Sequence, residues 1–146
     1  MSSDYKNILL AVDFSKDSEL IGQRAIDLAR RYEAKLSLIH VVINLKDAFY
    51  EQIMSSLSEN VEEQIIQLAK QQLHTLAQRL EIPTTNCIVE LGSPKRGILK
   101  AVEEHDIDLI VMGSHGLSGW DNLLGSTADA VLHKAPCDVL AIRLSS

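Results

Sequence analysis

The segment VMGSHGLSGWDNLLGST, residues 111–127, has a composition suited to binding phosphate. Its glycines and the two residues that open the next predicted helix are Gly113, Gly116, Gly119, Gly125, Ser126 and Thr127. An apolar run followed by a glycine-rich turn and a helix start presents unpaired backbone N–H groups to an anion, along with the positive end of the helix dipole. Gly113 and Gly116 would let the backbone approach a ligand without a Cβ in the way. The amides and hydroxyls that open the helix are the expected donors.

This motif differs from two familiar phosphate-binding patterns. It is not the dinucleotide pattern G-x-G-x-x-G, because the run reads G-S-H-G-L-S-G. It is not a P-loop either, because no lysine follows the closing Gly125. Two interpretations stay open: a backbone cradle for phosphate, or a tight turn in which Gly125 relieves packing between a helix and a strand.

Asp13 directly follows the first apolar run, residues 7–12. A carboxylate at the mouth of a crevice accepts hydrogen bonds, for example from a ribose or from the amine of a base. An acidic side chain near a helix start is also stabilised by the helix dipole, which gives Asp13 a purely structural role. The sequence leaves both roles open.

The histidines and cysteines form no pattern typical of a metal or catalytic site. His115, in the glycine segment, would titrate near neutral pH or touch a phosphate, or simply be solvated. His40 lies in an apolar run and is predicted to be hydrogen-bonded near the core. The remaining histidines lack metal-ligand spacing: His74, His105 and His133. No residue flanking Cys87 or Cys137 would depress a thiol pKa, and no G-x-S-x-G motif occurs. We expect neither a metal site nor a catalytic nucleophile.

Short apolar runs alternate with helical patterns along the chain. Strands are predicted at residues 7–12, 34–43, 86–91, 108–112 and 138–144. A first helix is predicted after an N-cap at Ser15 or Asp17, and a second over residues 59–80. A third is predicted from a Ser93 cap, with Pro94 in its first turn, to about His105. A last helix is predicted from about Ser126 to before Pro136. Residues 44–58 are predicted to form a long connection. Such alternation predicts an α/β fold: a five-stranded, parallel, doubly wound sheet with helices on both faces.

The predicted sheet places the candidate residues at one edge. Ligands of doubly wound sheets lie beyond the carboxyl ends of strands, where the strand order reverses. Asp13 follows the first predicted strand and Gly113 follows the fourth. If these two strands are neighbours, both residues border the same crevice.

Length and composition fit a single globular domain over residues 1–146. Hydrophobic residues make up 46% of the chain, and the formal net charge is −6. A negative charge with no basic block argues against a nucleic-acid partner. The apolar stretch near the amino terminus is too short for a signal or a membrane span. With two cysteines fifty positions apart, we expect a reduced cytosolic protein.

The whole chain resembles the universal stress protein family, near its short single-domain bacterial type. The segments that carry the resemblance are ILLAVDFS, LSLIHVV, GSPKRGIL, DLIVMGSHG and LLGSTADAVLHKAPCDVLAIR. The resemblance implies an adenine-nucleotide α-hydrolase-like fold with strand order 3-2-1-4-5. It also implies a cytoplasmic protein of the stress response, and a homodimer built through the strand at 138–144. An apolar edge strand guarded only by Asp138 and Arg143 is consistent with such pairing.

The resemblance further implies that the chain binds ATP, with or without Mg²⁺, as a regulatory ligand in the crevice between strands 1 and 4. At most slow ATP hydrolysis is expected, because no general base is evident. The implied nucleotide-binding residues are Asp13, Val41, Met112, Gly113, Gly116, Gly125, Ser126 and Thr127. Eight residues separate Gly116 from Gly125, one fewer than in the ATP-binding branch. The alternative is a nucleotide-free homodimeric interaction module.

Overall fold

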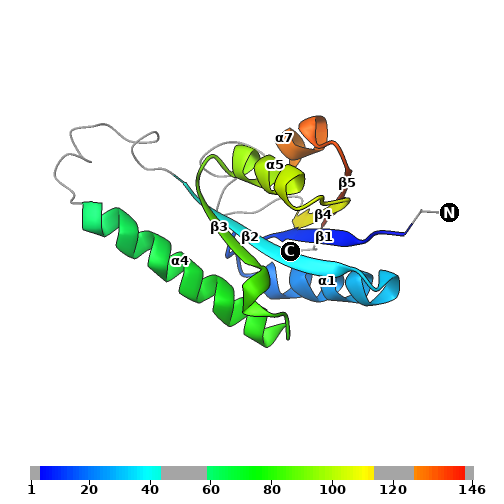
Figure 1. Ribbon diagram of the computed structural model, residues 1–146, viewed down its shortest axis with the longest axis horizontal. Coiled ribbons are helices and arrows are strands. Elements are labelled where there is room, and N and C mark those ends of the chain that lie inside the picture. The colour runs from blue at the N-terminus through cyan, green and yellow to red at the C-terminus, as the bar shows by residue number, and fades with distance from the viewer. Residues whose placement is uncertain (1–3, 44–58, 114–126, 144–146) are drawn as a thin grey trace.

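A computed structural model describes residues 4–43, 59–113 and 127–143 of the chain (Figure 1). Its elements, in chain order, are β1 (Asn7–Ala11), α1 (Ser18–Tyr32), β2 (Lys35–Ile43), α4 (Glu59–Arg79), a 3₁₀ turn (Thr84–Asn86), β3 (Cys87–Gly92), α5 (Pro94–Glu104), β4 (Leu109–Gly113), α7 (Thr127–Lys134) and β5 (Asp138–Ile142). Every predicted strand and helix is present, with ends that coincide with the prediction or differ from it by one or two residues. The predicted connection at 44–58 lies outside the described residues.

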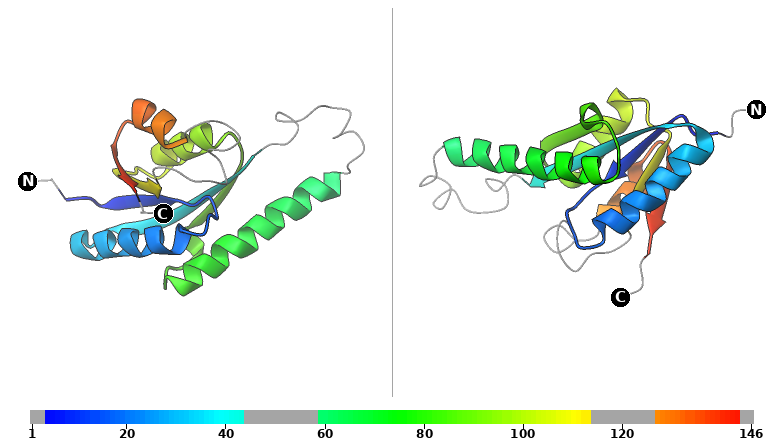
Figure 2. Two further views of the ribbon diagram at one scale, coloured as in Figure 1. Left: turned by 180° about the vertical axis from the view of Figure 1, so that it is seen from behind. Right: turned by 90° about the horizontal axis from the view of Figure 1, so that it is seen from below.

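The five strands form one parallel sheet in the order β3-β2-β1-β4-β5, as expected. Helices α1 and α4 cover one face, and α5 and α7 cover the other (Figures 1 and 2). In the central register, Leu10 of β1 pairs with Leu38 of β2 on one side and Val111 of β4 on the other. Strands β1 and β4 are therefore adjacent, and their carboxyl ends share one edge of the sheet.

Strand β1 is buried on both faces, as its unbroken apolar sequence predicts. Ile8 and Leu10 belong to the core under α1 and α4, whereas Leu9 and Ala11 belong to the core under α5 and α7. This alternation follows from the two-residue period of a strand. Burial on both sides fixes the register, because a slip by one residue would send every side chain to the opposite face.

The two predicted helix starts differ in outcome. Ser93 caps α5, with its hydroxyl accepting a hydrogen bond from the backbone N–H of Arg96 at 3.4 Å, and Pro94 occupies the first turn. At α1, Asp17 holds the cap position, but its side chain makes no capping hydrogen bond. The backbone carbonyl of Ser15 instead accepts from the N–H of Ser18 at 3.1 Å. The predicted cap position Asp17 is therefore confirmed, but its side chain does not make the capping hydrogen bond that the prediction assumed.

Polar side chains tie the amino-terminal segment to the sheet edge opposite the candidate site. Asp108 accepts hydrogen bonds from the backbone N–H groups of Lys6 at 2.8 Å and Asn7 at 3.1 Å. The Tyr5 hydroxyl donates to Asp138 at 2.6 Å, and this bond is the main cause that raises the pKa of Tyr5 to about 12. The chain ahead of β1 is thus anchored to the first residue of β5.

Candidate functional site

The predicted site residues that the structure describes all lie at the carboxyl edge of the sheet or at the start of α7. Asp13 follows β1, Val41 lies near the end of β2, and Met112 and Gly113 end β4. Thr127 is the first residue of α7. Gly116, Gly125 and Ser126 lie outside the described residues. The structure therefore brings together two strand ends that are about 100 positions apart in the sequence, at the point where the strand order reverses.

Val41 and Met112 are buried side chains on the α5 and α7 face of the sheet. Their exposed fractions are 1% and 3%, and both belong to the core under these helices. They form an apolar floor for the carboxyl edge rather than an open contact surface.

Asp13 is half-buried, and one of its two carboxylate oxygens serves the local turn. The backbone N–H of Ser15 donates to Asp13 Oδ1 at 3.0 Å, which closes an Asx turn between β1 and α1. No residue in the described parts of the chain donates a hydrogen bond to Oδ2. The structural role and the binding role of Asp13 are thus compatible, since each uses a different oxygen.

Phe14, next to Asp13, has a left-handed backbone with φ of 59°. This conformation is rare for a bulky side chain, and such residues carry strain of about 1–3 kcal/mol that the surroundings must offset. The Phe14 ring packs on the imidazole of His40, with ring centroids 4.1 Å apart and an interplanar angle of 33°. Glu33, Glu81 and Asp106 have a similar φ after the ends of helices, so it is the packing of Phe14 on His40 that distinguishes the turn after β1.

His40, predicted to be a hydrogen-bonded residue near the core, is confirmed as one. Its Nδ1 lies 2.6 Å from the carbonyl oxygen of Val12, and a carbonyl only accepts, so Nδ1 carries the hydrogen and donates it. Burial lowers the pKa of His40, while the bond to Val12 and the nearby charge of Asp13 act in the opposite direction. Neither the His40–Phe14 contact nor the positive φ leaves a signal in the sequence.

We expect the stability of the folded protein to fall as the pH drops below about 6.5, the ordinary pKa of histidine. His40 has a lower pKa when folded, so the unfolded chain binds more protons below that pH, and the stability is lost as the pH falls toward the folded pKa. Urea unfolding at about pH 7.5 and about pH 5.5 measures this loss. The loss should be smaller in His40→Asn; an equal loss in both proteins would contradict the assignment to His40.

Two glycines of the site have packing roles. A Cβ on Gly113 would lie 3.0 Å from Cδ1 of Ile21 in α1, so this glycine brings β4 close to α1. A Cβ on Gly97 would lie only 2.6 Å from Cγ2 of Val41, so α5 rests directly on β2 at a predicted site residue. Gly97 is not among the predicted site residues, although it lies within the segment GSPKRGIL.

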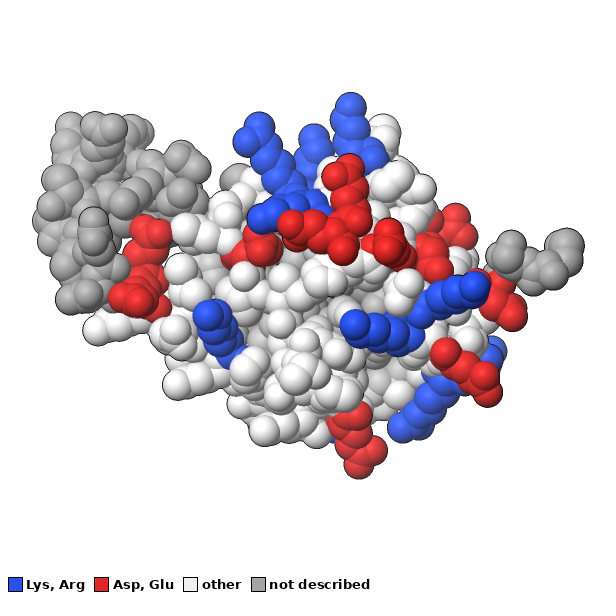
Figure 3. Space-filling model, viewed as in Figure 1, with Lys and Arg blue, Asp and Glu red and all other residues white. Residues whose placement is uncertain are grey.

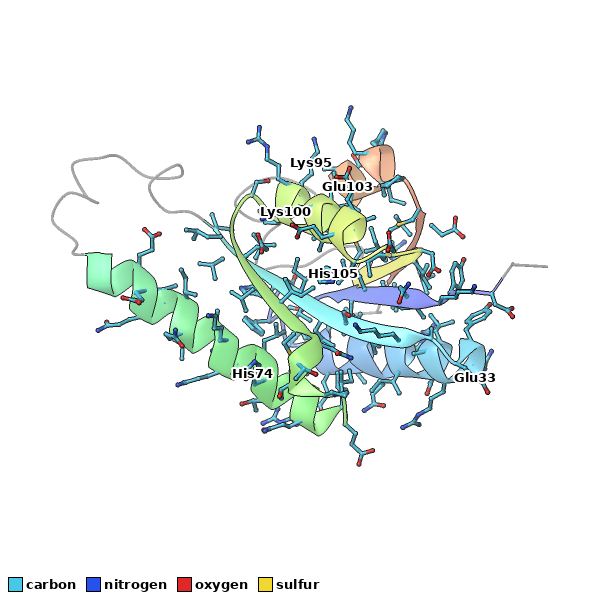
Figure 4. All side chains as sticks on the ribbon, in the orientation of Figure 1. Glu33, His74, Lys95, Lys100, Glu103 and His105 are labelled. Atoms are coloured by element: carbon cyan, nitrogen blue, oxygen red, sulfur yellow. The ribbon has the colours of Figure 1, made fainter. Side chains whose placement is uncertain are left out.

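The other chemically capable side chains do not converge on this edge. Within residues 4–43, 59–113 and 127–143, no three or more potential metal ligands form a group. His74 and His105 lie on separate elements (Figure 4). Burial raises the pKa of both thiols, Cys87 and Cys137, which keeps them protonated near neutral pH.

Charged side chains of both signs cover the α5 and α7 side of the molecule. In Figure 3, Lys and Arg side chains gather at the top of the view, with acidic side chains directly below them. Nζ of Lys100 on α5 (Figure 4) donates a hydrogen bond to Oε1 of Glu90 on β3 at 3.1 Å. The positive charge on this face is thus partly neutralised by neighbouring carboxylates.

Comparison with known proteins agrees with this architecture. The model of the universal stress protein family matches residues 4–143. The chain is 36% identical over 138 residues to universal stress protein A homolog 1 of Coxiella burnetii, covering 94% of this chain and 96% of that protein. It is 38% identical over 143 residues to homolog 2 of the same organism, covering 97% of both.

Solved structures share the fold. The universal stress protein UspA from Lactobacillus plantarum superposes with a TM-score of 0.68 at 29% identity, over 97% of this chain and 100% of that chain. A universal stress protein in complex with cAMP superposes with a TM-score of 0.67 at 23% identity, over 98% and 100% of the two chains. The chain belongs to the universal stress protein family.

Proposed function

We propose that this protein binds an adenine nucleotide at the carboxyl edge of the sheet, in the crevice between β1 and β4. The ligand is ATP, with or without Mg²⁺, acting as a regulatory ligand of a single-domain cytoplasmic stress-response protein. The observation that carries the proposal is the adjacency of the ends of β1 and β4. It puts Asp13, whose Oδ2 accepts no hydrogen bond from the described residues, beside the strand that leads into the glycine segment.

Three further features support this ligand class. Helix α7 begins directly after the glycine segment, so its amino end offers backbone N–H groups to a phosphate. The buried side chains of Val41 and Met112 make the interior behind this edge apolar, which is typical of the surroundings of a small-molecule site. A relative with the same fold was solved in complex with cAMP, which contains the same adenosine unit.

The proposed contacts divide into two groups. Asp13 accepts a hydrogen bond from the nucleoside, which lies beyond the ends of the strands that carry Val41 and Met112. The phosphates lie against Gly113, Gly116, Gly125, Ser126 and Thr127. Helix α5 supports this arrangement from outside, because Gly97 lets it rest on Val41.

The proposal is tested by analysing what the purified protein carries and what it binds. Mass spectrometry of the supernatant after denaturation should detect ATP or ADP, and calorimetric titration with magnesium-ATP should give a saturable isotherm. Titration with cAMP and with GTP then defines the ligand within the nucleotide class. Folded protein that releases no nucleotide and gives no heat would favour the nucleotide-free interaction module.

A homodimer through residues 138–144 is part of the proposal. Strand β5 is at one end of the sheet order, so within the described part of the chain its outer edge offers backbone groups that pair with no other strand. Pairing of two such edges around a twofold axis would satisfy them and close the assembly.

We expect a sedimenting species of twice the 16.2 kDa chain mass. Ala141→Lys, which places a charge on β5, should shift the protein toward the monomer, whereas Lys95→Ala on α5 should not. A monomer at all concentrations of the unaltered protein, or an unchanged dimer in Ala141→Lys, would contradict the edge pairing.

A further inference from the structure

The turn that carries Asp13 is held from the face of the sheet opposite to Val41. Successive residues of β2 point to opposite faces, so His40 lies on the side of Leu38, under α1 and α4. Val41, the next residue, lies under α5 and α7. His40 is therefore adjacent in the chain to a proposed contact residue while its imidazole lies away from the proposed ligand.

The contacts of His40 converge on the two residues that flank Asp13. The Val12 carbonyl that accepts from Nδ1 belongs to the peptide unit whose nitrogen is that of Asp13. The imidazole also stacks on Phe14, the residue with the left-handed backbone. One contact fixes the peptide plane before Asp13, and the other holds the strained residue after it.

The backbone of the same turn is tied to β2 on its other side. The N–H of Val12 donates to the carbonyl of Ile39 at 2.8 Å, just past the end of β1. Beyond it, the turn is held by the Ser15 bond to Asp13, by the two contacts made by His40 and by the packing of Phe14 against the core under α1 and α4. His40 is thus one of the few groups that bear on the direction of the Asp13 carboxylate.

We propose that His40 is a positioning residue of the nucleotide site: through the Val12 carbonyl and the Phe14 ring it holds the Asp13 turn in its binding conformation without touching the ligand. This inference rests on the proposed nucleotide function. The apparent affinity for a ligand is the intrinsic affinity multiplied by the fraction of free protein that is already in the binding conformation. A residue that holds this conformation in the free protein therefore raises the apparent affinity.

The experiment compares two substitutions at position 40. His40→Asn keeps an N–H group near the place of Nδ1, and His40→Leu keeps apolar bulk but removes the donor. The dissociation constants of magnesium-ATP and of adenosine are measured by calorimetry. If the competent fraction falls to about a tenth, His40→Leu should bind both ligands about tenfold more weakly, because the lost contact is to the nucleoside. His40→Asn should stay within about threefold of the unaltered protein.

A second readout needs no ligand. The Ser15 amide donates to Asp13 Oδ1, so its hydrogen exchange reports directly on the turn. We expect exchange at Ser15 to be at least about tenfold faster in His40→Leu and nearly unchanged in His40→Asn. Leu36→Val, at the other end of β2 in the same core, controls for general loss of stability and should change neither exchange at Ser15 nor affinity.

The outcomes separate the two claims. Unchanged affinity or unchanged Ser15 exchange in His40→Leu would overturn the positioning role and leave the nucleotide function standing. Equal losses in His40→Leu and Leu36→Val would assign the effect to stability alone and would also overturn it. An unaltered protein that binds neither ATP nor adenosine would overturn the nucleotide function, and the positioning role with it.

Discussion

Asp13→Asn is expected to lower the affinity for ATP by about 10- to 100-fold while leaving the fold intact. A hydrogen bond to a charged group contributes about 1.5–3 kcal/mol, and the substitution removes the charge and turns one acceptor into a donor. The amide oxygen of asparagine still accepts the bond from the Ser15 N–H, so the turn itself is retained. Calorimetric titration of both proteins with magnesium-ATP, next to their thermal unfolding curves, measures the effect.

Asp17→Asn is the matched control for this change. It removes one negative charge from the same loop, but the Asp17 side chain makes no capping hydrogen bond. If a negative charge near the start of α1 affected ATP binding only through its long-range electrostatic field, Asp13→Asn and Asp17→Asn would change the affinity by the same factor. An Asp13→Asn protein with unaltered affinity would leave Asp13 with its structural role alone.

Gly97→Leu is expected to lower the free energy of unfolding by about 3 kcal/mol and to weaken nucleotide binding. Overpacking a well-packed contact by several methylene groups costs about 1–3 kcal/mol or more. The first added atom already falls 2.6 Å from Cγ2 of Val41, whose branched side chain has little rotameric freedom on a strand. Either α5 moves away from β2, or the Val41 side chain is displaced from its place at the floor of the site. Urea unfolding measures the first effect, and titration with ATP measures the second.

Glu103→Leu adds the same side chain at an exposed position of α5 and should change the stability by less than about 0.5 kcal/mol (Figure 4). Gly97→Ala adds a single Cβ, and its clash is partly offset by the better helix propensity of alanine. Its loss should therefore be smaller than that of Gly97→Leu. A Gly97→Leu protein as stable as the unaltered one would mean that α5 is not held at this contact.

The strands were predictable because each is a short apolar run bounded by polar or turn residues. Burial of β1 on both faces follows directly from NILLA, and the cap at Ser93 follows from a serine placed before a proline. The strand order came from the resemblance, since periodicity contains no information on which strands are neighbours. Strand ends were off by a residue or two because the partner strand, rather than local sequence, decides where pairing stops.

The fine geometry of the site was not predictable in the same way. Phe14 has a left-handed backbone, and its ring packs on His40, which is 26 positions away in the chain. The need for glycine at position 97 comes from Val41, which lies on β2, far from α5 in the sequence. Both contacts exist only once the sheet has brought the elements together, so local patterns have no signal for them.

The anchoring of Tyr5 to Asp138 gives the edge strand β5 a direction of fraying. Its first residue is exposed and is tied to the segment ahead of β1 by this hydrogen bond, whereas Ile142 at its other end is buried in the core under α1 and α4. Edge strands open more readily than central ones, so β5 should peel from Asp138 toward Ile142 when the bond to Tyr5 is lost. Native-state proteolysis would detect this opening as cleavage within β5. Tyr5→Phe removes the hydroxyl that holds Asp138, so it should make this cleavage faster.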